Sequence, residues 1–429
     1  SFEEEGQKYF EGYINIWADA EPDSPTERKY EKNPVKVWIK NIIANVPTSD
    51  EKFKQVLNKW KSGLLKLDKI EKGLFAKRYT STFNVVGATC SLTGSDFGFL
   101  NKYDFLKNGF DYVIFDEASK ATPPELLIPL LSGKSIIVIG DHKQLPPMID
   151  ENDFEEKLKE IGENELAEEI HEIELGKSHF EKLFRSSFQA NPTIITTLDT
   201  QYRMHKNIME VIDQFYQEEG GLKCGLPDDK IDIPDLAEKA SRWHGLKYKD
   251  GTFLSEDHHV LWVNVDDFEK RVGTSFTNQG EVSAINKILK LIKNSNGFKN
   301  LSTYSPKEDD KEIGLITFYG EQKKLLRKMA KDNHSDIPVR INTVDKFEGM
   351  ERNIIIVSTV RNNKEGNIGF AEKLQRINVA FSRPRRLLII VGNIDHFAFN
   401  KKNVPFYSRI KSIVESQNGK RDKTQLDVI

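Results

Sequence analysis

Short apolar runs alternate along the chain with longer segments in which apolar residues recur at helical spacing. The runs that predict strands form two series: 84–90, 112–115, 135–140 and 194–198, then 259–265, 313–317, 353–358 and 386–392. The amphipathic segments that predict helices lie around 205–216, 279–293, 320–331 and 371–382. Strands that alternate with amphipathic helices are typical of parallel sheets with crossover helices. The pattern therefore predicts an α/β protein with two parallel-sheet lobes.

The same pattern predicts where the chain divides. Residues 1–80 are mainly helical in pattern and predict an accessory segment, residues 81–199 carry the first series of strands, and residues 200–429 carry the second. A domain commonly contains about 150 to 200 residues, so the length of the chain suits two of them. Three polar stretches are predicted to be surface loops or a frayed end: 225–235, 295–312 and the residues after about Ser416.

Charge is nearly balanced overall but uneven along the chain. The formal net charge is −3, yet residues 51–80 carry nine Lys or Arg against three Asp or Glu, and residues 150–174 carry twelve Asp or Glu against two Lys. Each stretch is also typical of an ordinary solvated helix face. An anionic polymer would be steered away from the acidic stretch, so we expect any nucleic acid to lie on another face.

Neither a membrane span nor a disulfide framework is expected. No apolar run approaches the roughly 18 residues of a membrane span, and no segment with a basic head and an apolar core opens the chain. We therefore expect an intracellular protein, cytoplasmic or nuclear, without a membrane partner. Cys90 and Cys224 lie far apart and show no C-x-x-C or Cys/His spacing. The spacing favours neither a disulfide nor a structural zinc site.

Polar side chains follow two of the predicted strands of the first series. Asp116 and Glu117 end the run at 112–115, and Gln144 lies in the loop after the run at 135–139. Because ligands of open α/β sheets bind at the carboxyl ends of the strands, these groups predict a site for a nucleotide with its metal ion. Asp116 would hold Mg²⁺ on the nucleotide, Glu117 would orient the attacking water, and Gln144 would contact the γ-phosphate. An Asp-Glu pair at this place could instead cap a following helix.

The phosphate-binding loop that should precede such a site is absent from the 429 residues. In the pattern G-x-x-x-x-G-K-[ST], glycines let backbone N–H groups approach the phosphates and the lysine neutralises them. The nearest match is Gly133-Lys134-Ser135. There the first glycine would fall at Ile128, and the triplet precedes a strand instead of following one. We interpret this triplet as an ordinary turn.

Six sequence blocks, in their order and spacing, resemble the motifs of the 5′-to-3′ branch of superfamily 1 helicases, which includes the nonsense-mediated-decay RNA helicase and its DNA-acting relatives. The blocks are Val-Val-Gly-Ala-Thr-Cys at 85–90, Asp-Glu-Ala-Ser at 116–119, Gly-Asp-His-Lys-Gln-Leu-Pro-Pro at 140–147, Gln-Tyr-Arg-Met-His at 201–205, Thr-Val-Asp-Lys-Phe-Glu-Gly-Met-Glu at 343–351 and Asn-Val-Ala-Phe-Ser-Arg-Pro-Arg at 378–385. The resemblance covers roughly residues 84 to 393. It implies two RecA-like lobes with ATP hydrolysed in the cleft between them.

The resemblance also implies roles for two arginines of the second lobe. Arg203 and Arg383 would act as arginine fingers that reach the γ-phosphate when the cleft closes. Such fingers are worth on the order of 10³ to 10⁵ in rate in well-studied NTPases. The alternatives are a surface salt bridge for Arg203 and a solvated helix end for Arg383, which lies in a basic run.

Further residues take binding roles from the resemblance. Tyr202 would stack on adenine, with plain packing as the alternative, and Gly349 and Glu351 would lie beside the nucleotide. Single-stranded DNA or RNA would run across both lobes, held by hydroxyls at strand ends, although such hydroxyls are as often local caps. The hydroxyl residues are Thr89, Ser91, Thr317 and Thr343.

Several positions depart from the family pattern. Glu348 stands where the family has Gln, and Phe318 stands where it has Pro, whereas Gln322 matches a block to which we assign no chemistry. The adenine-side Gln motif and the Walker A loop are also missing. Residues 1–80 resemble the accessory insertion that follows those blocks in relatives. We therefore expect the C-terminal part of a longer helicase, with Walker A supplied by a preceding part of the same protein or by a partner chain.

Three functions remain open at this point. The first is an ATP-dependent nucleic-acid helicase or translocase that moves 5′ to 3′, in which the fragment alone is inactive. The second is a nucleic-acid-binding pseudo-helicase subunit or scaffold, which would not need the full set of catalytic side chains found here. The third is a protein of the exonuclease V alpha-subunit type, against which the Gln-Tyr-Arg-Met block argues.

Overall fold

The computed structural model describes residues 85–95, 109–147, 178–227, 242–301, 312–399 and 404–427, together with Gln55. The chain divides into two units, which are described separately. Unit 1 comprises Ser1–Ile114 and Glu125–Ile137, and unit 2 comprises Phe115–Pro124 and Val138–Ile429. The predicted accessory segment at 1–80 and the acidic stretch at 150–174 lie outside the described residues, apart from Gln55. The predicted domain boundaries therefore stay predictions.

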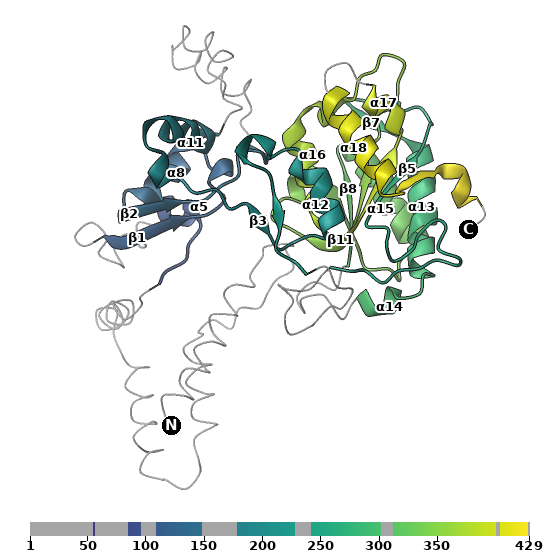
Figure 1. The fold of residues 1–429 in the computed structure, drawn as a ribbon, viewed down its shortest axis with the longest axis horizontal. Coiled ribbons are helices and arrows are strands. Elements are labelled where there is room, and N and C mark those ends of the chain that lie inside the picture. Colours follow the sequence, from purple (N-terminus) through teal and green to yellow (C-terminus); the bar gives the residue numbers. More distant parts are fainter. Residues whose placement is uncertain are drawn as a thin grey trace. The chain divides into compact units, whose positions relative to one another are not determined.

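Unit 1 contains a two-stranded sheet with a crossover helix (Figure 1). The elements that lie wholly or mainly in this unit are α5 Cys90–Ser95, β1 Phe110–Phe115, α8 Pro123–Leu130 and β2 Gly133–Val138. The Phe110 N–H donates to the Ser132 carbonyl beside the first residue of β2, and the Ile139 N–H after β2 donates to the Phe115 carbonyl at the end of β1. The two strands therefore run in the same direction, as the crossover pattern predicts.

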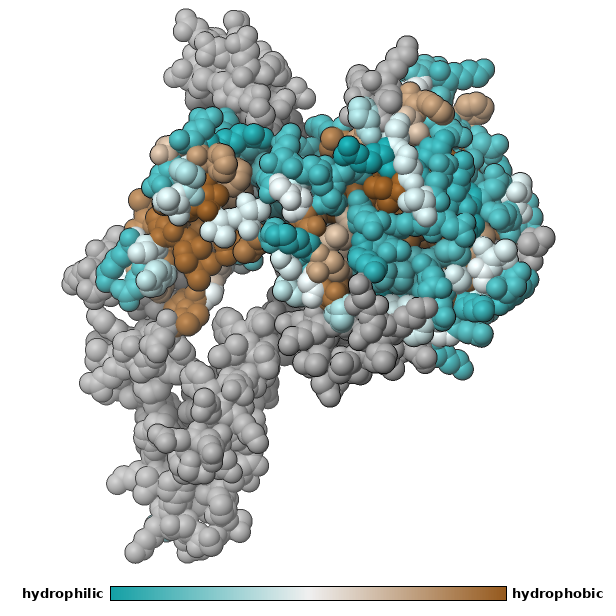
Figure 2. Space-filling model, in the orientation of Figure 1, coloured by the Kyte–Doolittle hydropathy of each residue, from teal (hydrophilic) through white to brown (hydrophobic). Residues whose placement is uncertain are grey.

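Apolar side chains of unit 1 are unusually exposed. Tyr112 and Ile114 lie two residues apart, on the same face of β1, and are 66% and 64% exposed. The neighbouring strand and helix also expose large apolar residues: Leu127, Ile128, Leu131, Ile136 and Ile137. Figure 2 shows hydrophobic residues gathered over this unit. A sheet of this composition is normally covered on both faces, so a layer of structure is missing from the described residues of unit 1.

Unit 2 is built around a parallel sheet of six strands in the order β12-β5-β11-β10-β8-β9. The strands are β5 Val260–Asn264, β8 Ile313–Thr317, β9 Val339–Thr343, β10 Arg352–Ser358, β11 Pro384–Gly392 and β12 Lys420–Asp422. Smaller pairings join β3 Thr200–Gln201 to β4 Lys223–Cys224 and β6 Lys270–Val272 to β7 Ser275–Thr277. The six-stranded sheet confirms the predicted α/β fold class.

Helices cover both faces of the large sheet, as the alternation of buried side chains requires. Ile355 and Val357 of β10 belong to one apolar core, whereas Ile354 and Ile356 belong to the other. The first core includes residues of α12 Lys206–Asp213, α16 Leu374–Phe381, α17 Ile394–Ala398 and α18 Val404–Ser416. The second includes residues of α13 Gln279–Lys293 and α15 Gly320–Asn333. The other α-helices among the described residues of unit 2 are α11 His179–Ala190 and α14 Phe298–Leu301.

The four predicted helices and all four predicted strands of the second series are confirmed, but two strands of the first series are wrong. Residues 85–89 form no strand, and α5 begins at Cys90. Ile194 ends a short 3₁₀ helix, Pro192–Ile194, residues 195–198 form no strand, and the next pairing is that of Thr200–Gln201. At both places the apolar side chains are exposed, with Val85 at 86% and Leu198 at 81%, so neither run is a core strand.

The chain after Ser416 does not fray as predicted. Residues 420–422 form the edge strand β12, which pairs in parallel with β5. Arg421 is buried, and its Nε donates to the Phe253 carbonyl at 2.8 Å. The guanidinium satisfies backbone carbonyls within the fold, so this polar segment gains the partners that a frayed end would lack. No helix among the described residues is long and apolar enough to cross a membrane.

Candidate functional site

Asp116 and Glu117 leave the sheet directly after β1 and belong to unit 2. Glu117 has φ 55°, in the left-handed region, and precedes the 3₁₀ helix η1, Ala118–Lys120. Its side chain makes no capping hydrogen bond, and one Asp116 carboxylate oxygen accepts the Glu117 N–H at 2.9 Å. The two carboxylates are exposed and are not used to cap η1, so they are available to a ligand.

The loop after β2 is held by one aspartate. One carboxylate oxygen of Asp141 accepts the Lys143 N–H at 2.9 Å, and the other accepts the Gln144 side-chain amide at 2.7 Å. The Gln144 amide oxygen is thereby turned toward Arg383, whose Nη2 donates to it at 3.2 Å. Gln144 and Arg383 stand 239 positions apart in the chain, and the structure brings these two predicted site residues together.

Arg383 is buried at the end of α16. It is 2% exposed, so the alternative of a solvated helix end is wrong. Its Nε donates to the Val379 carbonyl at 3.0 Å and its Nη2 to the Ser382 hydroxyl at 3.0 Å. Burial and the positive charge of Arg203 lower the pKa of Arg383 to about 10, so the guanidinium is still charged at neutral pH.

Arg203 lies in the segment before α12 and pairs with another predicted site residue. Its Nε contacts a Glu351 carboxylate oxygen at 2.9 Å, and its Nη1 donates to the Ser382 carbonyl at 3.3 Å. The Arg203 and Glu351 side chains are 39% and 41% exposed, so the pair is half-buried. The alternative for Arg203, a surface salt bridge, thus describes the geometry found here. The Arg203 guanidinium is nevertheless exposed enough to exchange Glu351 for another partner.

Sequence reasoning missed Lys120, which links Glu117 to Glu348. The Lys120 ammonium lies 3.3 Å from a carboxylate oxygen of Glu117 and 3.6 Å from one of Glu348. The Glu348 side chain is only 9% exposed, and that oxygen accepts no hydrogen bond from the described residues. Burial raises the pKa of Glu348 to about 7, against the lowering effects of Lys120 and Arg383. A glutamate here is therefore a poorly solvated acid, unlike the neutral amide that the family carries.

Two further residues predicted beside the nucleotide are exposed. Tyr202 is 51% exposed, and its ring lies against Gly225, where an added Cβ would come within 2.3 Å of the ring. Gly349 has φ +76°, a conformation that favours glycine, and an added Cβ there would meet no atom within 4 Å. A ring with an open face and a glycine beside open space both suit the approach of a ligand.

The hydroxyls predicted to bind nucleic acid lie in different environments. The Thr89 side chain accepts the Leu92 N–H at 3.3 Å, which is the local capping bond of the alternative reading. Thr317 at the end of β8 is fully buried, and its hydroxyl has no partner among the described residues. Thr343 ends β9 and is half-buried, whereas the Ser91 side chain lies outside the described residues. Their contact with a strand stays a prediction.

Gln322, to which the sequence assigned no chemistry, organises the carboxyl edge of the large sheet. Its amide nitrogen donates to the Asn278 carbonyl at 3.2 Å and the Ser358 hydroxyl at 3.0 Å. Ser358 in turn donates to the fully buried carboxylate of Glu281 at 2.6 Å. Burial raises the pKa of Glu281 to about 8, against these hydrogen bonds. This network joins α15, β10 and α13, so it holds the polar edge of the sheet together.

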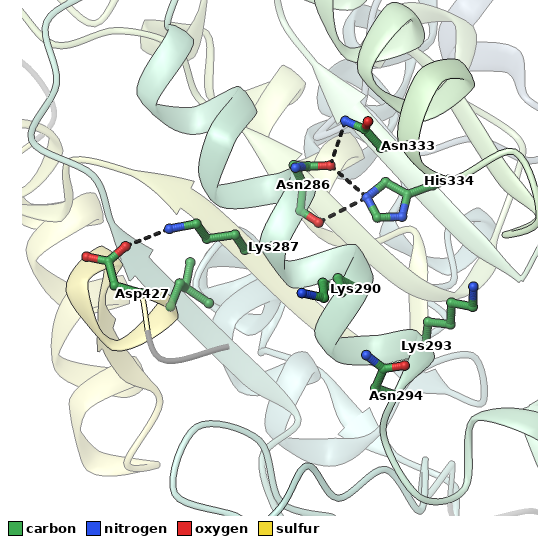
Figure 3. Close-up of a pocket in the computed structure, with 9 residues that line it drawn as sticks. Asn286, Lys287, Lys290, Lys293, Asn294, Asn333, His334 and Asp427 are labelled. Atoms are coloured by element: carbon green, nitrogen blue, oxygen red, sulfur yellow. Dashed lines mark hydrogen bonds and ion pairs between the residues drawn. The ribbon is translucent and has the colours of Figure 1, made fainter.

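A surface cavity of about 600 Å³ lies elsewhere in unit 2 (Figure 3). It is lined mainly by α13, the end of α15 and the last described residues of the chain. Lys287 is paired with Asp427 across it at 2.6 Å, and the Asn286 side-chain oxygen contacts both Asn333, at 3.1 Å, and His334, at 2.8 Å. No predicted site residue lines this cavity, so it does not belong to the candidate site.

The site suits a metal ion that is bound mainly by phosphates and water. No cluster of three or more His, Cys, Asp or Glu able to hold a metal is found in the described part of the chain. Mg²⁺ bound to a nucleotide usually takes one or two protein carboxylates and keeps several waters. Asp116, exposed at the strand end with oxygens open to solvent, fits that requirement.

A parallel sheet with carboxylates and an amide at strand ends, and with two arginines nearby, defines a nucleotide-binding α/β protein. A family model described as AAA domain matches residues 175–395, and a second with the same description matches residues 26–152. The chain belongs to this family and, with the relatives below, to superfamily 1 of the helicases.

Similar proteins include an "Uncharacterized ATP-dependent helicase" of Methanocaldococcus jannaschii, 29% identical over 86% of this chain and 47% of that protein. The "DNA replication ATP-dependent helicase/nuclease DNA2" of Saccharomyces cerevisiae is 30% identical over 78% of this chain and 20% of that protein. The chain thus spans about half the length, or less, of these curated relatives. Among solved structures, an arterivirus nonstructural protein 10 helicase covers 77% of this chain and 58% of its own, at 12% identity, with a TM-score of 0.28. A score this low supports no inference.

Proposed function

We propose that the chain is part of an ATP-dependent nucleic-acid helicase or translocase that hydrolyses ATP between two RecA-like lobes. The observation that carries this proposal is the contact between Gln144 and Arg383 at 3.2 Å. An amide that senses the γ-phosphate and an arginine that neutralises it must converge on one point. The names of the relatives as ATP-dependent helicases support the same reaction.

Each side chain of the site can be assigned one role in ATP hydrolysis. Asp116 would hold Mg²⁺, which neutralises charge on the phosphates when bound. Glu117, exposed and free of capping bonds, would orient the attacking water. When nucleotide binds, Arg203 would leave Glu351, and Arg383 would leave Gln144. Both guanidiniums would then bind oxygens of the transferred phosphoryl group and stabilise its charge, which they do only when nucleotide is present.

We further propose that the Walker A loop comes from a preceding part of the same protein or from a partner chain. The apolar side chains that unit 1 exposes on β1, α8 and β2 support this proposal. Further strands and helices of a RecA-like lobe would cover them and would place a phosphate loop beside Asp116. The loop's lysine would supply the charge that no G-x-x-x-x-G-K-[ST] segment supplies in this chain.

The track proposed for this motor is single-stranded nucleic acid, with movement from 5′ to 3′. The direction rests on the resemblance of the six sequence blocks to the 5′-to-3′ branch. DNA is favoured over RNA because the names of two similar yeast proteins refer to DNA: "DNA replication ATP-dependent helicase/nuclease DNA2" and "DNA polymerase alpha-associated DNA helicase A". We place the protein in the cytoplasm or the nucleus on the sequence grounds given above.

Substitution of Glu117 tests the proposed function. In the intact protein, Glu117→Gln should abolish ATP turnover stimulated by single-stranded DNA and leave binding of ATP and of the strand within about twofold, because only the carboxylate that orients water is lost. Glu415→Gln on α18 is the matched control, because the Glu415 carboxylate pairs with Lys420, which is not a candidate site residue, and this variant should hydrolyse ATP like the wild type. Undiminished turnover by Glu117→Gln would exclude the assigned role. A wild-type protein that binds the strand but never hydrolyses ATP would favour the scaffold alternative.

A further inference from the structure

Tyr216 lies three residues beyond the end of α12 and bonds to two motifs at once. Its hydroxyl donates to a carboxylate oxygen of Asp141 at 2.6 Å and accepts from the Asn378 side-chain amide at 2.8 Å. Asp141 belongs to the loop after β2, and Asn378 lies on α16, the helix that ends just before Arg383. All of these residues belong to unit 2.

The bonds around Tyr216 form a closed network between the loop and the helix. The carboxylate oxygen of Asp141 that accepts from Tyr216 also accepts from the Gln144 amide at 2.7 Å. Gln144 accepts from Arg383, and the Asn378 amide donates to the Lys143 carbonyl at 2.9 Å as well as to Tyr216. The loop is therefore bonded directly to Asn378 of α16 and to Arg383 just after it. Tyr216 connects these two links, because it bonds to both Asp141 and Asn378.

The segment around Tyr216 also holds the loop by charge. The Lys143 ammonium contacts Glu218 at 2.9 Å and Glu219 at 3.2 Å, and His142 Nε2 lies 3.2 Å from Glu219. Burial raises the pKa of Tyr216 far above its usual value, so its hydroxyl keeps its proton and remains a donor to Asp141. Hydrogen bonds and ion pairs from residues 216–219 thus hold the loop in place.

We propose that Tyr216 is a positioning residue that couples the nucleotide-sensing loop to α16, the helix that ends just before the arginine finger Arg383. The proposal rests on the proposed function. Its hydroxyl fixes the Asp141 carboxylate, which fixes the Gln144 amide and so the direction of the amide oxygen. When the γ-phosphate separates Gln144 from Arg383, the bonds of Tyr216 to Asp141 and Asn378 keep the loop and α16 in register. Without the hydroxyl, Gln144 and Arg383 can each still bind phosphate, but their positions relative to each other are no longer fixed.

The test is Tyr216→Phe in the intact protein, because phenylalanine keeps the ring and removes only the hydroxyl. We expect the kcat of strand-stimulated ATP hydrolysis to fall about tenfold, the order expected for loss of a hydrogen bond to a charged group. The KM for ATP and the strand affinity without nucleotide should stay within about twofold, since neither needs the loop and helix in register.

Tyr407→Phe is the matched control. The Tyr407 hydroxyl donates to the Ala371 carbonyl at 2.6 Å and is buried in the apolar core that includes α16, but it does not contact the loop. Both variants lose a buried hydroxyl, which makes one hydrogen bond at Tyr407 and two at Tyr216. Both should therefore lose thermal stability, while only Tyr216→Phe should lose kcat. In a Gln144→Ala background, Tyr216→Phe should lower kcat less than about threefold further, because the same route is already broken.

The outcomes separate this proposal from the one on which it rests. A kcat for Tyr216→Phe equal to that of Tyr407→Phe, in a protein that hydrolyses ATP, would overturn the coupling role alone. Full additivity with Gln144→Ala would overturn it as well. A wild-type protein that hydrolyses no ATP would overturn the proposed function and this inference together.

Discussion

Glu348 places a buried carboxylate close to Glu117 and Arg383, the two charged side chains that the proposed reaction needs. Its neighbour Lys120 is shared with Glu117, and the charge of Arg383 acts on the same carboxyl. A γ-phosphate brought close to an ionised Glu348 would be repelled, whereas a protonated Glu348 or an amide would not repel it. The departure from the family pattern therefore makes the site sensitive to pH.

Glu348→Gln should stabilise the chain more at high pH than at low pH. Burial raises the pKa of Glu348 to about 7, above the value near 4.5 that it has when unfolded. A group with a raised folded-state pKa contributes stability that is complete below about pH 4.5 and is lost as pH rises through about 7. The variant has no such loss, so the difference in free energy of unfolding should grow by about 1 to 3 kcal/mol across that window.

Urea unfolding of both proteins at about pH 5 and pH 8 measures this difference. All other titrating groups are shared, so their contributions cancel in the comparison. A difference between Glu348→Gln and wild type that is the same at both pH values would show that Glu348 keeps an ordinary acid pKa in the fold.

At the scale of single residues, the sequence identified those that lie inside recognisable blocks. Gln144 and Arg383 were predicted from separate blocks, and the structure brings them into contact. Tyr216 and Lys120 could not be found in this way, because their roles exist only through partners elsewhere in the chain. Tyr216 meets Asn378 across 162 positions, and nothing local to either residue signals that contact.

At the scale of elements, the apolar runs predicted the central strands well and the edge strands poorly. β10 and β11 are buried on both faces and therefore read as continuous apolar runs. β9 at the edge reads Val-Arg-Ile-Asn-Thr, and β12 at the other edge reads Lys-Arg-Asp. An edge strand is packed on fewer sides, so it can form with many polar residues. Its sequence then lacks the apolar run from which a strand would be predicted.

The β12 edge depends on a glycine that no larger residue can replace. A Cβ at Gly419 would lie 2.2 Å from the Val260 carbonyl oxygen, a backbone atom of β5 that cannot move without disturbing the sheet. Gly419→Ala should therefore destabilise the chain by about 1 to 3 kcal/mol. The measurement is the midpoint of urea unfolding together with its slope.

Gly320→Ala is the control for this substitution. Gly320 begins α15, and a Cβ there would meet no atom within 4 Å. Alanine at this place should be neutral or stabilising by up to about 1 kcal/mol, because it restricts the unfolded chain. If Gly419→Ala proves as harmless as Gly320→Ala, then β12 does not pack on β5 in solution and the C-terminal residues fray as the polar sequence first indicated.

At the scale of the whole molecule, the two units differ in how far their described residues bury apolar side chains. The large sheet of unit 2 has helices on both faces and two apolar cores. Unit 1 has two described strands and exposes Tyr112, Ile114 and Leu131. The sequence predicted a missing lysine loop but not this exposure, because exposure of apolar side chains depends on what else folds around them.

The chain by itself should hydrolyse no ATP measurably, even with single-stranded DNA present. Asp116, Glu117, Arg203 and Arg383 supply one side of a phosphate site, but backbone N–H groups and a lysine from a phosphate loop are needed on the other. Without them the nucleotide is neither bound tightly nor aligned, and the arginines keep their present partners Glu351 and Gln144.

Phosphate release by the purified chain, measured beside the intact protein at equal concentration, tests this expectation. The Glu117→Gln form of the chain is the control, because any contaminating ATPase would survive that substitution. Turnover by the chain that equals the intact protein and disappears in Glu117→Gln would show that some other segment supplies the phosphate-binding groups. Turnover confined to the intact protein would instead tie hydrolysis to the preceding part proposed above, which would also cover Tyr112 and Ile114, since one RecA-like sheet both buries its strands and presents the loop.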